Sequence, residues 1–302
     1  MLLLLGHGAL PEAGGLALVV ESFLPWLGAA VAVLFLAALV GMARFGIIPV
    51  VAAAVSWSVV FAPVLLGGTA ATAGSSSGSS ADIGSVAGDP VAGETAGLKV
   101  VTQNLRAGNP DAAAVVEGLA DSGADVVVLQ ELTGQSLEGI APVLDVAFGY
   151  RQLTGTVGVW SRFPLGAGEP LTLGLDWPRA LSVPVEMPDG PVQLYAVHLP
   201  SVRPGEVENR NSGLSELAEI VAADPSARVL VVGDFNAAST DSAFAPLLET
   251  LEEARAGFGF TWPATYPLTR PDHILYRGFT ALEASVIDSP GTDHLAALAL
   301  LE

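Results

Sequence analysis

Six segments of the sequence place polar side chains at a point where a predicted strand begins or ends. Their side chains are carboxylates, amides and imidazoles, the groups that bind divalent cations and transfer protons. The segments are Asn104, Gln130-Glu131, His198, Gly-Asp-Phe-Asn-Ala at 233–237, Asp272-His273 and Asp293-His294. Loops at strand ends are where a rigid fold presents reactive groups. One polar strand end carries little information, but six together predict a single functional site.

Short apolar runs predict the strands that position these side chains. The predicted strands lie near 98–104, 125–130, 147–161, 169–176, 180–187, 191–198, 228–232, 272–277, 280–287 and 295–301. Helices are predicted near 110–122, 205–223 and 242–253. Strands outnumber helices and follow one another in both strand–helix and hairpin orders. This pattern predicts an α/β (α+β) sandwich with mixed sheets, and it disfavours a doubly wound parallel sheet.

The order of these motifs resembles the endonuclease/exonuclease/phosphatase superfamily over about residues 98–301. The most specific segments are Gly-Asp-Phe-Asn-Ala at 233–237 and Gly-Thr-Asp-His at 291–294. Four weaker segments occur in the family's order: Gln130-Glu131, Ser-Arg-Phe-Pro at 161–164, His198-Leu199, and Arg-Pro-Asp-His-Ile-Leu at 270–275. The resemblance implies a four-layer sandwich, with two mixed β-sheets face to face and helices outside.

The resemblance also implies a metal-dependent hydrolase that acts on phosphoric esters, in the first place phosphodiesters. Negative oxygens shield the phosphorus of a phosphodiester, so a hard cation is needed to neutralise the developing charge. Mg²⁺ (or Mn²⁺) prefers oxygen ligands and keeps several waters, so one or two carboxylates and an amide suffice. The implied ligands are Glu131, Asn104 beside it, and Asp293, which binds directly or through water.

The remaining residues of the set have implied roles in proton transfer. Asp234 orients and deprotonates the attacking water, and Asn236 holds that water or a phosphoryl oxygen. His198 and His294 donate to phosphate oxygens or protonate the leaving oxygen. Asp272 accepts a hydrogen bond from the ring of His294 and fixes its tautomer.

Each of these residues also has an ordinary structural interpretation. Asn104, Glu131 and Asp234 are residue types that cap strand ends, turns and helices. A histidine such as His198 can be a hydrogen-bonded core residue, and His273 is expected to be structural. Only the combination favours catalysis over these separate interpretations.

The N-terminal part of the chain has a different composition. Residues 22–43 carry no charge, and Asp82 is the first charged residue after Arg44. Two stretches, about 23–43 and 45–66, are long enough to cross a bilayer and predict a transmembrane helical hairpin, so that 1–66 is a membrane segment. The alternative is a buried hairpin of a soluble protein. With Arg44 in the cytoplasm, the positive-inside rule predicts a multi-pass protein of the cell membrane with residues 67–302 outside.

Residues 67–97 consist mainly of Gly, Ser, Ala and Thr and predict a flexible linker. The linker separates the membrane segment from a catalytic domain at 98–302. The composition gives no indication of an oligomer.

Composition limits the possible functions of the 302-residue chain. It has no cysteine, which excludes disulfides, a thiolate zinc site and a cysteine nucleophile. The net charge is −19, and residues 98–302 hold 11 basic and 26 acidic residues, which disfavours extensive neutralisation of a nucleic-acid backbone. The candidate functions are a nuclease, a phospholipid or sphingomyelin head-group phosphodiesterase, and a non-catalytic binding domain displayed on the membrane.

Overall fold

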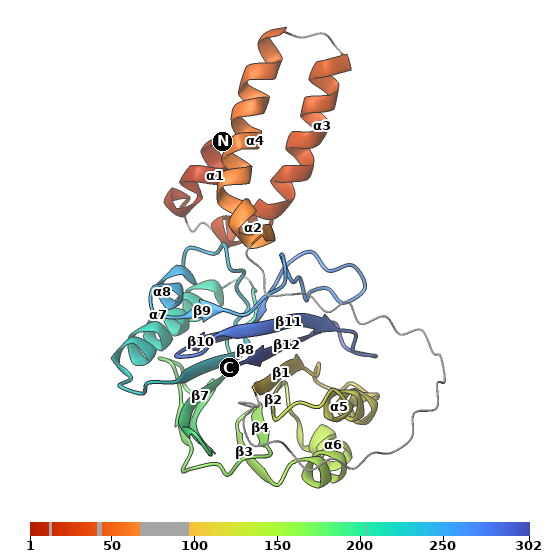
Figure 1. Cartoon of the computed structure of the whole chain (residues 1–302), viewed down its shortest axis with the longest axis vertical. Helices are drawn as coiled ribbons and strands as arrows, with labels where there is room; N and C mark the ends of the chain where they lie inside the picture. The colour runs from red at the N-terminus through yellow and green to blue at the C-terminus, as the bar shows by residue number, and fades with distance from the viewer. Residues whose placement is uncertain (12–13, 41–43, 67–96, 204) are drawn as a thin grey trace.

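Two six-stranded β-sheets face each other and carry helices on their outer faces in the computed structural model (Figure 1). The structure describes residues 1–11, 14–40, 44–66, 97–203 and 205–302. The strand order in the first sheet is β11 (Ala281–Ile287), β12 (Ala296–Leu301), β1 (Leu98–Asn104), β2 (Val126–Gln130), β4 (Val157–Ser161) and β3 (Tyr150–Thr154). The order in the second is β5 (Glu169–Leu171), β6 (Ala180–Met187), β7 (Gly190–His198), β8 (Val229–Asp234), β10 (Asp272–Arg277) and β9 (Glu252–Glu253). The predicted sandwich of two mixed sheets is confirmed.

Three apolar layers hold the sandwich together. The central layer lies between the two sheets, and the outer layers lie under α5 (Ala112–Asp121) and α6 (Gly134–Ala147) on one side and α7 (Val207–Ala223) and α8 (Ala245–Leu248) on the other. Residues 194–197 of β7 are apolar without interruption because both faces of the strand are covered. Leu194 and Ala196 join the central layer, whereas Tyr195 and Val197 join the layer under α7. Strands covered on both faces need no polar alternation.

The strand register brings the polar strand ends to one edge of the sandwich. Strands β1 and β2 are parallel, with Asn104 opposite Gln130. Strands β7 and β8 are also parallel, with His198 opposite Asp234. Strand β10 runs antiparallel to β8 and begins with Asp272 opposite Asp234. Parallel neighbours end at the same edge, so these side chains meet although they are far apart in sequence.

The N-terminal helices are α1 (Leu2–Gly6), α2 (Leu16–Ser22), α3 (Leu27–Val40) and α4 (Arg44–Leu66). Helices α3 and α4 lie side by side and project from the sandwich (Figure 1). By length and composition, Ile47–Leu66 of α4 is long and apolar enough to cross a membrane.

The first predicted span, 23–43, differs from the described helix. Helix α3 has 14 residues, and a bend of 53° separates it from α2. A short 3₁₀ turn at Leu24–Trp26 occupies the break, where Pro25 lacks the N–H that a continuous helix needs. Taken together, Leu16–Ser22 and Leu24–Val40 pass the same test of length and apolar composition as Ile47–Leu66, as a bent pair.

Some predicted local elements also differ from the structure. The helix expected near 242–253 is only α8, and it is followed by β9. Helix α6 was not predicted, because Gly139 and Pro142 interrupt its pattern; a capping box between Thr133 and Ser136 marks its start. The predicted linker lies outside the described residues except for Gly97.

Candidate active site

The side chain of Asn104 connects the two sheets at the edge where the polar strand ends meet. Its Nδ2 donates to Asp234 Oδ2 at 2.9 Å and to Glu131 Oε1 at 3.2 Å. Its Oδ1 accepts the N–H of Arg106 at 2.9 Å, which fixes the orientation of the amide. Asn104 is 1% exposed. One buried amide therefore sets the spacing between two carboxylates that belong to different sheets.

Glu131 follows β2 in a left-handed backbone conformation, with φ at +59°. Such a conformation is strained for a residue with a side chain, and strain of this kind is concentrated at functional sites. The Ala107 N–H donates to Oε2 at 2.7 Å, and His198 Nε2 lies 4.0 Å from Oε1. Burial opposes ionisation, but the hydrogen bonds from Ala107 and Asn104 and the nearby histidines outweigh it and lower the pKa of Glu131. The side chain is 32% exposed, so an ionised carboxylate faces the cavity.

Asp234 ends β8 and is almost completely buried. Its Oδ1 accepts the N–H of Asn236 at 2.9 Å, and Asn236 itself has φ at +49° and donates its Nδ2 to Leu199 O at 3.0 Å. The preceding Gly233 has φ at +147°, and a Cβ there would lie 2.0 Å from Val197 O, so only glycine fits. Burial and the charge of Asp272 raise the pKa of Asp234 to about 7.

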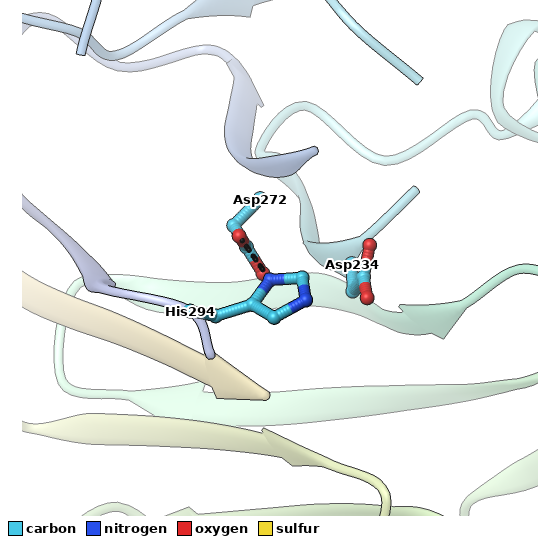
Figure 2. A group of neighbouring side chains, drawn as sticks. All are labelled: Asp234, Asp272 and His294. Atoms are coloured by element: carbon cyan, nitrogen blue, oxygen red, sulfur yellow. Dashed lines mark hydrogen bonds and ion pairs between the residues drawn. The ribbon is translucent and has the colours of Figure 1, made fainter. Parts of the chain in front are cut away.

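Asp272 and His294 form a buried pair beside Asp234 (Figure 2). His294 Nδ1 lies 2.8 Å from Asp272 Oδ2, which also accepts from Thr261 Oγ1 at 2.6 Å. The second ring nitrogen of His294 points towards Asp234 (Figure 2). Burial opposes the charged imidazole, but the charge and hydrogen bond of Asp272 outweigh it and raise the pKa of His294 to about 10. His294 is therefore a cation at neutral pH.

His198 is the last residue of β7 and lies next to Glu131. Its Nδ1 lies 3.1 Å from Thr156 Oγ1, and the residue is 8% exposed. Burial, together with the charges of Arg179 and His294, lowers the pKa of His198 to about 4 against the opposing effect of Glu131. The two histidines therefore differ in charge at neutral pH. Thr156 was missed by the sequence analysis because an isolated threonine in a hairpin has no distinguishing pattern.

A cavity of about 440 Å³ opens over these side chains. Six of the eight predicted site residues line it: Asn104, Glu131, Asp234, Asn236, Asp293 and His294. The other two are joined to the lining by the contacts already given, His198 through Glu131 and Asp272 through His294. Asp293 is exposed at the cavity. The structure thus brings together all eight residues that the sequence singled out.

The N-terminal segment also lines this cavity, a position that its sequence does not indicate. Leu18, Val19 and Ser22 of α2, with Phe23 after it, form part of the lining together with Trp262. Helix α2 ends at Ser22, and β1 begins only at Leu98. No local pattern in the sequence of α2 connects it with the strand-end motifs.

The donor chemistry of the cavity fits a hard divalent cation. Glu131, Asp234 and Asp293 contribute carboxylates to one lining, in which His294 is protonated. Glu131 and Asp293 face the open cavity, which leaves room for the waters that Mg²⁺ retains. Carboxylate oxygens also have spare lone pairs beyond the hydrogen bonds described.

Asp234, Asp272 and His294 form a second group whose ligand atoms lie within 4.8 Å of one another. Buried Asp272 Oδ1 has no hydrogen-bond partner within the described part of the chain. In this group His294 Nδ1 and Asp272 Oδ2 are bound to each other, so a cation would have to compete for these atoms. The predicted set of Asn104, Glu131 and Asp293 lines the open cavity and stays a prediction beside this second group.

A buried ionic cluster around Glu253 lies next to the loop that follows Asn236. Glu253 on β9 contacts Arg270 Nε at 2.9 Å and His273 Nδ1 at 2.7 Å, and Ser239 Oγ donates to it at 3.0 Å. His273 Nε2 also contacts Ala237 O at 2.8 Å, which agrees with the structural role expected for this histidine. The cluster ties the loop after Asn236 to the start of β10.

Replacing Glu253 by glutamine is expected to lower the free energy of unfolding by about 3 kcal/mol at pH 7, because it leaves the buried guanidinium of Arg270 uncompensated. Burial opposes ionisation, but His273 and Arg270 outweigh it and hold the pKa of Glu253 well below its usual range. The carboxylate therefore stabilises the fold above the ordinary glutamate pKa of about 4.3, and this contribution is lost as the pH falls below it.

Thermal unfolding of the full chain in detergent at pH 7 and pH 4 measures this effect. The matched control is Glu252→Gln, which changes the neighbouring exposed residue of β9, whose carboxylate contacts the Tyr276 hydroxyl. Equal melting temperatures for the two variants at pH 7 would contradict the expectation, as would a difference that grows at low pH.

Residues 101–294 match the Endonuclease/Exonuclease/phosphatase family. No curated protein matches the chain significantly.

Three solved structures show the similarity of fold. Zebrafish (D. rerio) TDP2 complexed with a single-strand DNA product has 18% identity and a TM-score of 0.60, covering 68% of this chain and 98% of its own. A family protein from Leptotrichia buccalis has 15% identity and a TM-score of 0.54, covering 68% and 99%. Sphingomyelinase C from Streptomyces griseocarneus has 20% identity and a TM-score of 0.52, also covering 68% and 99%. Together with the match of residues 101–294, the two facing sheets and the strand-end site identify the chain as a member of the Endonuclease/Exonuclease/phosphatase family.

Proposed function

We propose that the protein is a membrane-tethered, divalent-metal-dependent hydrolase of phosphodiesters. The observation that carries the proposal is the bridge made by Asn104 between the Glu131 carboxylate and Asp234 at one cavity. This arrangement holds a cation ligand and a general base at a fixed separation. A binding domain that had lost catalysis would have no need to retain both carboxylates and the Asp272–His294 pair.

Asn104, Glu131 and Asp293 are the residues that would hold Mg²⁺ or Mn²⁺. The cation, when bound, neutralises charge on the phosphoryl oxygens. Asp234 takes a proton from the attacking water, and its pKa of about 7 suits a base that works near neutral pH. Asn236 holds the carboxylate of Asp234 through its backbone N–H and contributes its side chain to the lining beside the water or a phosphoryl oxygen.

The two histidines act on the phosphate from different charge states. His294 is an imidazolium held in place by Asp272, so its free nitrogen donates a proton to a phosphate oxygen or to the leaving oxygen. His198 is neutral at pH 7 and donates a hydrogen bond through one ring nitrogen. No covalent enzyme intermediate is required.

The apolar hairpin of α3 and α4 supports the membrane tether. We propose that the protein is a multi-pass protein of the cell membrane, with the catalytic domain outside the cytoplasm and Arg44 inside. The organisation into a membrane segment at 1–66, a linker at 67–97 and a catalytic domain at 98–302 is part of this proposal.

Loss of activity on metal removal tests the proposed reaction. The full chain in detergent should release p-nitrophenol from bis(p-nitrophenyl) phosphate with Mg²⁺ or Mn²⁺, and EDTA should abolish the release. Excess Mg²⁺ should then restore it. Undiminished hydrolysis in EDTA would rule out the metal-dependent reaction.

A further inference from the structure

Helix α2 gives the active-site cavity an apolar side. Leu18, Val19 and Phe23 line the same cavity as the proposed catalytic residues, and Val19 and Phe23 are 49% and 38% exposed. Aliphatic and aromatic side chains in this position cannot hydrogen-bond to a phosphate or a sugar. The cavity therefore combines a polar catalytic side with an apolar side supplied by the N-terminal segment.

A buried carboxylate fastens α2 to the catalytic domain. Glu21 is 1% exposed, and its Oε2 accepts from Ser242 N at 2.9 Å and Ser242 Oγ at 3.2 Å. Its backbone oxygen accepts from Thr240 Oγ1 at 2.6 Å, and His7 Nδ1 lies 3.0 Å from Oε1. Thr240 and Ser242 belong to the loop that follows the motif at 233–237. Helix α2, with its apolar side chains at the cavity, is thus attached to the loop that continues from Asp234 through Asn236.

The cavity lies at the base of the apolar hairpin. Only the 3₁₀ turn at Leu24–Trp26 separates Phe23 from α3. Trp26 stacks on Phe260 at 5.7 Å and donates its Nε1 to Leu268 O at 2.8 Å, while Phe61 of α4 packs on Phe258 at 5.7 Å. Aromatic side chains with polar handles favour the boundary between lipid and water. A bilayer that takes up the hairpin would have its surface at this level, next to the cavity.

Charge also favours a substrate other than a long nucleic acid. The chain carries −19 overall, and tight binding of a nucleic-acid backbone depends on releasing counterions from many phosphates through basic side chains. A single phosphodiester group needs only local neutralisation, which a bound cation and His294 can supply.

We propose that α2 is a specificity-determining wall and that the site takes a phosphodiester lipid from the adjoining bilayer, with the apolar part of the lipid against Val19 and Phe23. This inference rests on the proposed hydrolase function. Water forms the new P–O bond and gives a proton to Asp234, while the ester P–O bond breaks and the leaving oxygen takes a proton from His294. The products are an alcohol and a phosphomonoester.

The test compares two substrates with the same phosphodiester head group. The full chain is reconstituted with Mg²⁺ in vesicles that contain phosphatidylglycerol, and hydrolysis of this lipid is compared with that of water-soluble glycerophosphoglycerol, which lacks acyl chains. The expected kcat/KM is at least about tenfold higher for the lipid, because its apolar part is removed from water on binding.

Three variants on α2 test whether this preference depends on the wall. Val19→Asp should reduce the lipid-to-soluble preference about tenfold or more, because an unpaired carboxylate resists burial against apolar groups. Leu16→Asp, at a half-exposed position of the same helix outside the lining, should keep both rates. Val19→Leu should keep the preference.

The outcomes separate this inference from the function on which it rests. If the wild-type chain hydrolyses neither these substrates nor bis(p-nitrophenyl) phosphate, the proposed function fails. If it cleaves bis(p-nitrophenyl) phosphate with Mg²⁺ but shows no preference for the lipid, or prefers plasmid DNA, only the lipid assignment is overturned. Equal effects of Val19→Asp and Leu16→Asp on the preference overturn the role of α2.

Discussion

Asp234→Asn should lower kcat by about 10²–10⁴-fold, the range typical for loss of a general base. Asparagine has the same shape as aspartate, and its single amide oxygen can still accept one of the two hydrogen bonds, from Asn104 Nδ2 or from the Asn236 N–H. An amide, however, cannot accept the proton of the attacking water. Steady-state hydrolysis of bis(p-nitrophenyl) phosphate at saturating Mg²⁺ measures the loss.

The matched control for this variant is Asp121→Asn, which removes an exposed carboxylate at the end of α5. It makes the same Asp-to-Asn change away from the cavity and should leave kcat unaltered. A melting temperature of Asp234→Asn close to that of the wild type would show that the fold is intact. Wild-type turnover in a folded Asp234→Asn enzyme would refute the assignment of Asp234 as the base.

Glu131→Gln is expected to weaken metal binding by at least about tenfold, since even indirect supports of a metal site contribute on this scale. Glutamine keeps the length of the side chain but removes the negative charge that makes Glu131 a ligand for a hard cation. The concentration of Mg²⁺ that gives half-maximal activity should rise accordingly. Binding of Mn²⁺ measured by electron paramagnetic resonance gives a second readout that does not depend on turnover.

Glu138→Gln is the corresponding control, because Glu138 is an exposed glutamate on α6, the helix that follows Glu131. Its affinity for Mn²⁺ should equal that of the wild type. If Glu131→Gln also binds Mn²⁺ with wild-type affinity, the metal lies elsewhere, and the group of Asp234, Asp272 and His294 becomes the next candidate.

The sequence predicts the sheets well because their information is local. A run such as 229–232 is continuously apolar since β8 is covered on both faces, and the polar residues that follow it mark the end of the strand. The same reasoning located the strand ends that carry Asn104, His198 and Asp234. The rule that parallel neighbours end at one edge accounts for the pairs Asn104–Gln130 and His198–Asp234, whereas Asn104 meets Asp234 through the packing of the two sheets.

The remaining features depend on contacts between distant parts of the chain. The position of α2 at the cavity results from Glu21 meeting Ser242, and nothing in residues 16–22 indicates that partner. The pKa values of His198 and His294 likewise differ because of a contact between separate segments. Burial lowers both, but the charge and hydrogen bond of Asp272 outweigh it at His294. Thr156 and Glu253 are further examples, because each takes its role from a contact with a histidine 20 or more residues away in sequence, His198 and His273 respectively.

The bridge made by Asn104 has a consequence for dynamics. Glu131, the proposed cation ligand, follows a strand of the first sheet, and Asp234, the proposed base, ends a strand of the second. Any fluctuation that slides or separates the sheets must therefore stretch this bridge and change the distance between ligand and base. The buried apolar side chains between the two sheets pack closely and therefore limit such fluctuations. Substitutions in that layer are therefore expected to change the rate of the proposed hydrolysis, although they contact none of the proposed catalytic residues.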